Sequence, residues 1–226
     1  METTATDIAR RLAGHGLILR GALDADALDG LTLGDGRLVG TLLLVGNAGR
    51  AMWRHFEAAP EAALADHPLD RWTRRVVGAI AAAHGAEARY PFGGPPHAPF
   101  QRWAALAEGL KPSPLMILIH PEYGLWHAWR AALLFAGPVA LPKSPPAAHP
   151  CASCAEKPCM TSCPAGAISD AGYDTRLCLA HVRSADGAAC REQGCLARLA
   201  CPVGPAHAYD PAEAAHHMRW FADPPA

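Results

Sequence analysis

The chain has no cysteine in its first 150 residues, whereas eight cysteines lie between Cys151 and Cys201. Cysteines that served only as core side chains would be spread more evenly along the sequence. Their absence from the longer part of the chain, and their concentration in the shorter part, therefore indicate a dedicated inorganic module near the C-terminus.

The sequence also lacks the features that mark export or membrane insertion. Residues 1–16 contain no long apolar stretch of the kind found in secretory signals. The longest apolar runs, such as 42–45 and 115–119, are far too short to span a bilayer. We therefore expect a cytoplasmic protein without a membrane span, whose reduced thiols favour metal binding over disulfides. The formal net charge of -1 gives no reason to expect a nucleic-acid partner.

The part without cysteine has the pattern of an α/β (α+β) domain. Apolar residues at helical spacing, among them Trp72, Val76 and Ile80, occur between short continuous apolar runs that are typical of buried strands. The expected helices span 4–13, 50–65, 69–84 and 100–110. The expected strands span 16–23, 37–45, 115–119 and 129–135, with the last two as neighbours and a turn at 46–49.

Proline and glycine divide the chain. Residues 90–99 are too rich in both for regular structure, and five prolines between Gly137 and Pro150 indicate a semi-rigid connector. We therefore predict four parts: an α/β domain at 1–137, a proline-rich connector at 138–150, a cysteine module at 151–210, and a tail at 211–226 in which His216 and His217 are solvated.

The first four cysteines follow the pattern Cys151-x2-Cys154-x4-Cys159-x3-Cys163-Pro164. Closely spaced cysteines on one loop supply three thiolates to a 4Fe–4S cluster, and the cysteine before proline ligates the other cluster in two-cluster ferredoxins. A crossed assignment fits this logic and uses every cysteine. One cluster would be held by Cys151, Cys154, Cys159 and Cys201, and the other by Cys163, Cys178, Cys190 and Cys195.

Other uses of eight cysteines stay open at this point. Four thiolates also bind structural zinc, although the second set contains no CxxC pair and Cys-Pro elements are foreign to zinc ribbons. A disulfide framework would require an exported protein. The irregular spacing of the second set leaves room for a single cluster with four incidental cysteines.

Further candidate residues surround the expected strand at 115–119. His120 ends this strand, where ligand-binding residues of open α/β sheets commonly lie, and neutral imidazole is a good cobalt ligand. The alternative is that His120 caps a turn shaped by Pro121 and Gly124. Arg130 could hold an anionic group or form a structural ion pair. Four aromatic residues could line a pocket for a flat cofactor or belong to the core: Tyr90, Phe92, Trp126 and Trp129.

The segment from Ile119 to Arg130, IHPEYGLWHAWR, resembles the HPxxGxWxxxR stretch of the C-type cobalamin-trafficking proteins. This resemblance implies a nitroreductase-like α/β domain that binds cobalamin. The residues that would contribute to such a site are Tyr90, His120, Gly124, Trp126 and Arg130. A flavin on the same scaffold is not excluded, although the sequence contains no flavin-specific element.

The cysteine module is similar to that of the epoxyqueuosine reductases, which join a cobalamin-binding nitroreductase-like domain to two 4Fe–4S clusters. Arg176-Leu177-Cys178 stands where that family carries a lone cysteine after an arginine. The resemblance implies a ferredoxin-like module with two 4Fe–4S clusters. The chain departs from the family in having no aspartate that matches its catalytic acid and no recognisable surface for tRNA.

These observations favour an iron–sulfur redox protein that passes electrons to a cofactor of the first domain, with cobalamin as the leading candidate. A carrier such as ferredoxin or flavodoxin would be the electron donor. The alternative is a dedicated ferredoxin-type electron carrier that docks to a partner oxidoreductase. An oxygen-sensing iron–sulfur regulator ranks last, because the sequence contains no DNA-reading motif.

Overall fold

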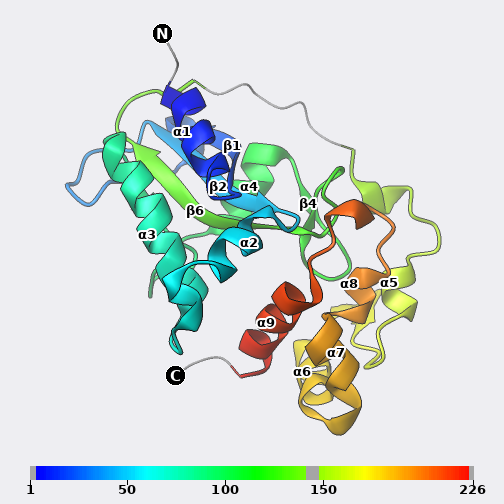
Figure 1. The fold of residues 1–226 in the computed structure, drawn as a ribbon. Coiled ribbons are helices and arrows are strands. Elements are labelled where there is room, and N and C mark those ends of the chain that lie inside the picture. The colour runs from blue at the N-terminus through cyan, green and yellow to red at the C-terminus, as the bar shows by residue number, and fades with distance from the viewer. Residues whose placement is uncertain (1–3, 141–147, 224–226) are drawn as a thin grey trace. The chain divides into compact units, whose positions relative to one another are not determined.

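The computed structural model describes residues 4–140 and 148–223, which form two compact units (Figure 1). Unit 1 comprises Met1–Gly109 and His127–Ala147, and unit 2 comprises Leu110–Trp126 and Ala148–Ala226. The fold mixes helices and strands throughout, so the expected α/β (α+β) class is confirmed.

The boundaries of these units differ from the expected division at residue 137. Residues 110–126 leave the α/β unit and belong to the unit that carries the cysteines. The reason is hydrophobic, because Leu115, Ile119 and Leu125 share one buried cluster with Cys159 and Cys201. Most of the expected connector, residues 141–147, lies outside the described residues.

Unit 1 is built on a four-stranded sheet in the order β1-β2-β6-β3, and every neighbouring pair is antiparallel. The strands are β1 (Ile18–Asp24), β2 (Thr41–Ala48), β3 (Glu87–Arg89) and β6 (His127–Phe135). The helices of this unit are α1 (Thr4–Ala13), α2 (Ala51–Glu57), α3 (Pro68–Ala83) and α4 (Phe100–Glu108), with short 3-10 turns at Ala25–Ala27 and Pro60–Ala63.

Helices pack on the sheet of unit 1 because its two central strands are apolar on both faces. Leu43 and Val45 of β2 join a core cluster with residues of α1, α2 and α3, while the alternate residues Leu42 and Leu44 are equally buried. Helix α4 packs against β1. Both faces of the central strands are therefore buried in the protein.

Several local predictions for unit 1 are confirmed, and others are wrong. The helices expected at 4–13 and 69–84 form as α1 and α3. The helix expected at 50–65 ends at Glu57, because Pro60 forces the preceding Ala59 into an extended conformation. The turn expected at 46–49 is wrong in part, since residues 46–48 continue strand β2.

The strand expected at 115–119 is much shorter than predicted. Only β5 (Leu118–Ile119) is extended, and it pairs with β4 (Lys111–Pro112) rather than with the strand at 129–135. Met116 turns the chain back with a φ of 60°, which ends any continuous strand. An apolar run can therefore form a turn as well as a strand.

Unit 2 consists of short elements around the cysteines. Its remaining strands, β7 (Ile168–Ser169) and β8 (Gly172–Tyr173), form a small hairpin. Its helices are α5 (Pro158–Thr161), α6 (Thr175–Arg183), α7 (Ala188–Gln193), α8 (Leu196–Leu199) and α9 (Pro211–Ala222), with 3-10 turns at Pro150–Ala152, Ala185–Gly187 and Pro205–His207.

The expected polar tail is instead the helix α9, and it contributes to the core of unit 2. Ala222 packs with Val182 and Cys190. His216, expected to be solvated, is only 8% exposed. Among the described residues, no helix is both long enough and apolar enough to cross a membrane.

Candidate metal centre

Four cysteines of unit 2 come together in what we call the first set: Cys151, Cys154, Cys159 and Cys201. Burial raises the pKa of the Cys151 thiol, and the other three thiols lie close enough to raise it further. All four also line one hollow. The first set is therefore a single site, although Cys201 is far from the others in sequence.

The remaining cysteines form the second set: Cys163, Cys178, Cys190 and Cys195. Burial raises the pKa of the Cys178 thiol, a side-chain hydrogen bond with Tyr173 lowers it, and the Cys163 and Cys190 thiols raise it. Burial likewise raises the pKa of Cys195, with Cys178 and Cys190 acting in the same direction. The thiols are grouped as the crossed assignment requires, and the binding of a cluster by each set stays a prediction.

Both sets suit an anionic sulfur-bound cluster. Backbone N–H groups donate hydrogen bonds to the thiols: that of Val203 to Cys201, and those of Ala197 and Arg198 to Cys195. Such donors stabilise thiolates and set the potentials of iron–sulfur clusters. All eight cysteines are free thiols, so the disulfide alternative finds no support in the structure.

Within residues 4–140 and 148–223, no three His, Cys, Asp or Glu side chains converge closely enough to hold a single metal ion. This result and the grouping of the thiols are compatible, because the four thiolates of a 4Fe–4S cluster bind four different iron atoms. They need to surround a volume rather than meet at one point.

Local sequence explains how the first set is held. Pro158 begins the short helix α5, and Lys157 before it adopts a left-handed conformation with a φ of 39°. This sharp entry turns Cys159 into the apolar cluster that also contains Ile119 and Leu125. The Lys157-Pro158 pair thus shapes the loop between the second and third cysteines.

His120 lies in a tight turn, which was the alternative to its role as a ligand-binding residue. Its backbone exchanges two 2.9 Å hydrogen bonds with Gly124, and its Nδ1 accepts N–H bonds from Glu122 and Tyr123 at 3.1 and 3.2 Å. The imidazole also stacks on Tyr123, with ring centroids 4.2 Å apart. His120 therefore organises its own loop through Nδ1.

The His120–Gly124 loop packs, through its backbone, against the chain that follows Cys201 in unit 2. A Cβ atom added at Gly124 would lie 1.9 Å from the carbonyl oxygen of Val203, and one added at Gly204 would lie 2.5 Å from the carbonyl carbon of Tyr123. Only glycine permits this approach. The loop that resembles a cobalamin-binding motif thus supports the chain directly after Cys201.

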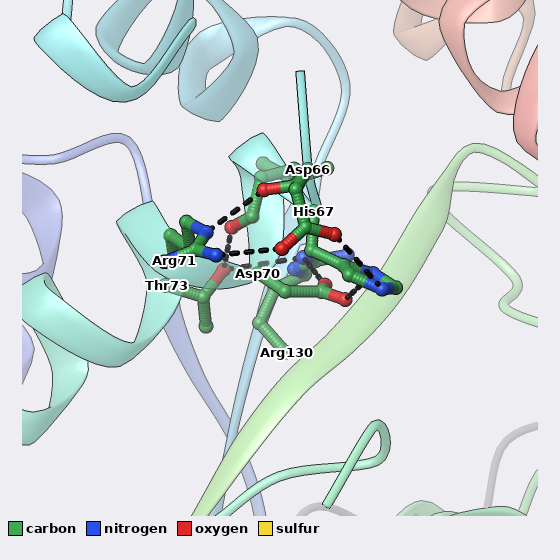
Figure 2. Close-up of polar contacts among 7 residues, drawn as sticks. Asp66, His67, Asp70, Arg71, Thr73 and Arg130 are labelled. Carbon is green, nitrogen blue, oxygen red and sulfur yellow. Dashed lines mark hydrogen bonds and ion pairs between the residues drawn. The ribbon is translucent and has the colours of Figure 1, made fainter. Parts of the chain in front are cut away.

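Arg130 makes the structural ion pair that was one of its two expected roles. Figure 2 shows its guanidinium with Asp70 and Thr73 of α3, at 3.3 Å from Asp70 Oδ1 and 3.1 Å from Thr73 Oγ1. Arg130 is 9% exposed. It ties strand β6 to helix α3 inside unit 1.

The charged residues around Arg130 were not predicted as a group. Asp66, His67 and Arg71 flank Pro68 at the start of α3 (Figure 2). His67 lies 3.5 Å from Asp66 and 3.6 Å from Asp70, and Arg71 donates to Asp66 at 2.6 Å. The sequence signal that could have revealed the group is the alternation of acidic and basic residues around a proline at a helix start.

The four candidate aromatic residues do not gather at one place within either unit. Tyr90 stacks on Phe92 in unit 1, with ring centroids 5.2 Å apart, and Arg74 lies over both rings. Trp129, also in unit 1, donates to Glu108 at 3.0 Å. Trp126 belongs to unit 2, where it is buried against Tyr209.

Comparison with solved structures shows a likeness of fold. No protein-family model matches the chain, and no curated protein sequence matches it. The architecture is similar to that of epoxyqueuosine reductases, over 92% of this chain and 69% of theirs.

Two of these structures come from named bacteria. The Streptococcus thermophilus enzyme matches with a TM-score of 0.54 at 12% identity. The Bacillus subtilis enzyme matches with a TM-score of 0.52, also at 12% identity. A third epoxyqueuosine reductase, solved with a tRNA-Tyr stem loop, matches at 0.50 and 13%. At these identities the likeness concerns the fold.

Proposed function

We propose that this protein is an iron–sulfur redox protein that binds two 4Fe–4S clusters, one in each cysteine set, and supplies electrons to a cofactor bound by unit 1. The observation that carries the proposal is the sorting of eight free thiols into two sets of four. Bound clusters would relay single electrons from a soluble donor, such as a ferredoxin or flavodoxin, towards the acceptor.

Cobalamin is the acceptor that we propose first. The support is the IHPEYGLWHAWR segment, together with the fold that the chain shares with reductases. Reduction of a corrinoid needs a strong reductant, which low-potential clusters supply. A visible-spectrum titration with cobalamin tests this part, and no binding at micromolar concentration would remove it.

The central experiment is purification without oxygen, followed by assays of iron, sulfide, zinc, cobalt and flavin and by electron paramagnetic resonance spectra. We expect about eight iron and about eight sulfide per chain, as two 4Fe–4S clusters require. A colourless protein that contained zinc would overturn the proposal.

Matched variants test the assignment of the two sets. Cys154→Ala should remove the first cluster and Cys178→Ala the second, so each should lose about half of the iron. Ser162→Ala, a change beside Cys163 that leaves every thiol in place, should retain all of it. Loss of all iron in one cysteine variant and none in the other would point to a single cluster.

A dedicated electron carrier is the second candidate. It is favoured by one observation, namely that two proposed ligand contacts of unit 1 are engaged within the protein: Arg130 with Asp70, and Tyr90 with Phe92. A carrier would contain both clusters, bind neither cobalamin nor flavin, and purify with a partner oxidoreductase. The cobalt and flavin assays on the same sample separate the two functions.

A further inference from the structure

Tyr173 lies directly before the helix that carries one cysteine of the second set. It is the last residue of β8 and precedes Asp174, the N-cap of helix α6. The Asp174 carboxylate accepts hydrogen bonds from the N–H groups of Arg176 and Leu177 at 2.9 and 3.2 Å. Its carbonyl oxygen accepts one from the N–H of Cys178 at 3.2 Å. This helix cap therefore fixes the backbone of Tyr173 relative to Cys178.

The hairpin holds Tyr173 from its other side. Tyr173 pairs with Ile168 across the two strands, and the N–H of Asp174 donates to the carbonyl oxygen of Ala167 at 2.8 Å. Ile168 is buried in the cluster of apolar side chains around the cysteines. The backbone of Tyr173 is thus held between a buried strand and a helix cap.

The hydroxyl of Tyr173 donates a hydrogen bond to the sulfur of Cys178. Burial raises the pKa of this hydroxyl, the hydrogen bond raises it further, and the charges of Cys178, Cys195 and Cys163 act in the same direction. These three cysteines all belong to the second set, so the polar end of Tyr173 lies beside that set. Because its pKa is raised above an ordinary value of about 10, the hydroxyl keeps its proton and stays a donor.

We propose that Tyr173 is a tuning residue, whose hydroxyl donates to a ligand of the second cluster and thereby raises the reduction potential of that cluster. The inference rests on the proposed function. Each one-electron reduction by the external donor adds a negative charge to a cluster without making or breaking a covalent bond. A hydrogen-bond donor at a ligand sulfur stabilises the more negative form more strongly than the oxidised one. The second cluster would therefore hold an electron more firmly than four thiolates alone would allow.

The test is a redox titration followed by electron paramagnetic resonance on the full chain loaded with clusters. Tyr173→Phe removes only the hydroxyl, and the signals are assigned with Cys154→Ala and Cys178→Ala. In Tyr173→Phe, we expect the reduced-to-oxidised ratio of the second cluster at a fixed potential to fall at least about threefold, which is about 28 mV for a one-electron couple. The ratio of the first cluster should stay the same.

A second measurement reads the hydrogen bond directly. In heavy water the Tyr173 hydroxyl carries deuterium, and pulsed electron paramagnetic resonance detects its coupling to the reduced second cluster. Tyr173→Phe should lack this coupling but keep those of the backbone N–H groups that donate to Cys195. Identical spectra from the two proteins would mean that the hydroxyl does not reach the cluster, and would overturn the inference.

Ser169→Ala is the matched control, because it removes a hydroxyl from the same hairpin and leaves Tyr173 in place. Ser169 Oγ donates to the carbonyl oxygen of Gly172 at 3.4 Å and accepts from the N–H of Ala171 at 3.2 Å. Its loss should loosen the hairpin but leave both potentials unchanged. An equal downward shift in Ser169→Ala would trace the effect to the position of the hairpin and contradict the tuning role.

The remaining outcomes separate the inference from the proposed function. A Tyr173→Phe protein that holds both clusters at wild-type potentials would overturn the inference and leave the proposed function intact. Loss of the second cluster from Tyr173→Phe would assign the hydroxyl to cluster assembly and would overturn the tuning role as well. Absence of clusters from the wild-type protein would remove the proposed function itself.

Discussion

At the scale of single residues, Gly124 has the most demanding position in the candidate metal centre. Its φ of 58° is left-handed, and the carbonyl oxygen of Val203 occupies the place of a Cβ atom. We expect Gly124→Ala to destabilise unit 2 and to lower its iron content. The left-handed conformation alone costs an ordinary residue about 1–2 kcal/mol, and the backbone clash adds to this.

Gly166 provides the matched control for Gly124. Its φ is 57°, and nothing lies within 4 Å of the place where a Cβ atom would be. Gly166→Ala should therefore lose only the conformational part of the stability. Urea unfolding and iron assays on both variants check this, and equal losses would show that the packing against Val203 is unimportant.

Arg130 is a second test at this scale, because it was a candidate ligand residue. Since it bridges Asp70 and Thr73 in a largely buried position, Arg130→Met should lower the free energy of unfolding by about 1–3 kcal/mol. It should leave iron binding unchanged. Circular dichroism during urea unfolding measures this change.

Arg71→Met is the control for Arg130, since Arg71 and Asp66 are both more than half exposed and such pairs contribute about 0–1 kcal/mol. If Arg130 served only to hold an anionic cofactor, Arg130→Met would be as stable as the wild type and would bind cobalamin more weakly. That result would contradict the structural role.

At the scale of elements, the contact of helix α4 with strand β1 depends on a small residue. A Cβ atom at Gly21 would lie 2.7 Å from the Cβ and 2.8 Å from the carbonyl oxygen of Ala107. Gly21→Ala should push α4 away from the sheet at a cost of about 1–3 kcal/mol, typical of overpacking.

Gly137→Ala is the control, because it replaces a glycine of the same unit without creating a clash. No atom lies within 4 Å of the place where the Cβ atom of an alanine at position 137 would be. Thermal unfolding of both variants compares them directly. A Gly21→Ala protein that melts at the same temperature as Gly137→Ala would mean that α4 tolerates displacement.

Elements could be predicted where one local pattern dominated. The spacing of Trp72, Val76 and Ile80 predicted α3. The Cys-Pro pairs led to a crossed assignment of the cysteines, which stays a prediction. The apolar run at 115–119 misled, because Leu115 and Ile119 are buried with the cysteines while Met116 turns the chain between them. The contacts of Arg198 with Trp126 and Tyr209 could not be found from the sequence, since only the fold brings these residues together.

At the scale of the whole molecule, the two units are interleaved along the chain. Residues 110–126 leave unit 1, contribute to unit 2, and return to unit 1 at β6, its second central strand. The proline-rich connector is therefore not the natural place to divide the protein. A cut after residue 140 keeps every helix and strand of unit 1 but separates residues 110–126 from the residues that bury them.

We therefore expect the fragment 1–140 to form its sheet but to self-associate and to bind a hydrophobic dye, because Leu115, Ile119 and Leu125 lose their partners around the cysteines. The same fragment with these three residues replaced by serine should be monomeric and bind little dye. Size-exclusion chromatography and dye fluorescence distinguish the two fragments. If the unaltered fragment were monomeric and bound no dye, residues 110–126 would be able to bury their apolar side chains without the cysteine segment, and the interleaved division would be wrong. If instead both fragments failed to unfold cooperatively, unit 1 would depend on unit 2 for its own stability.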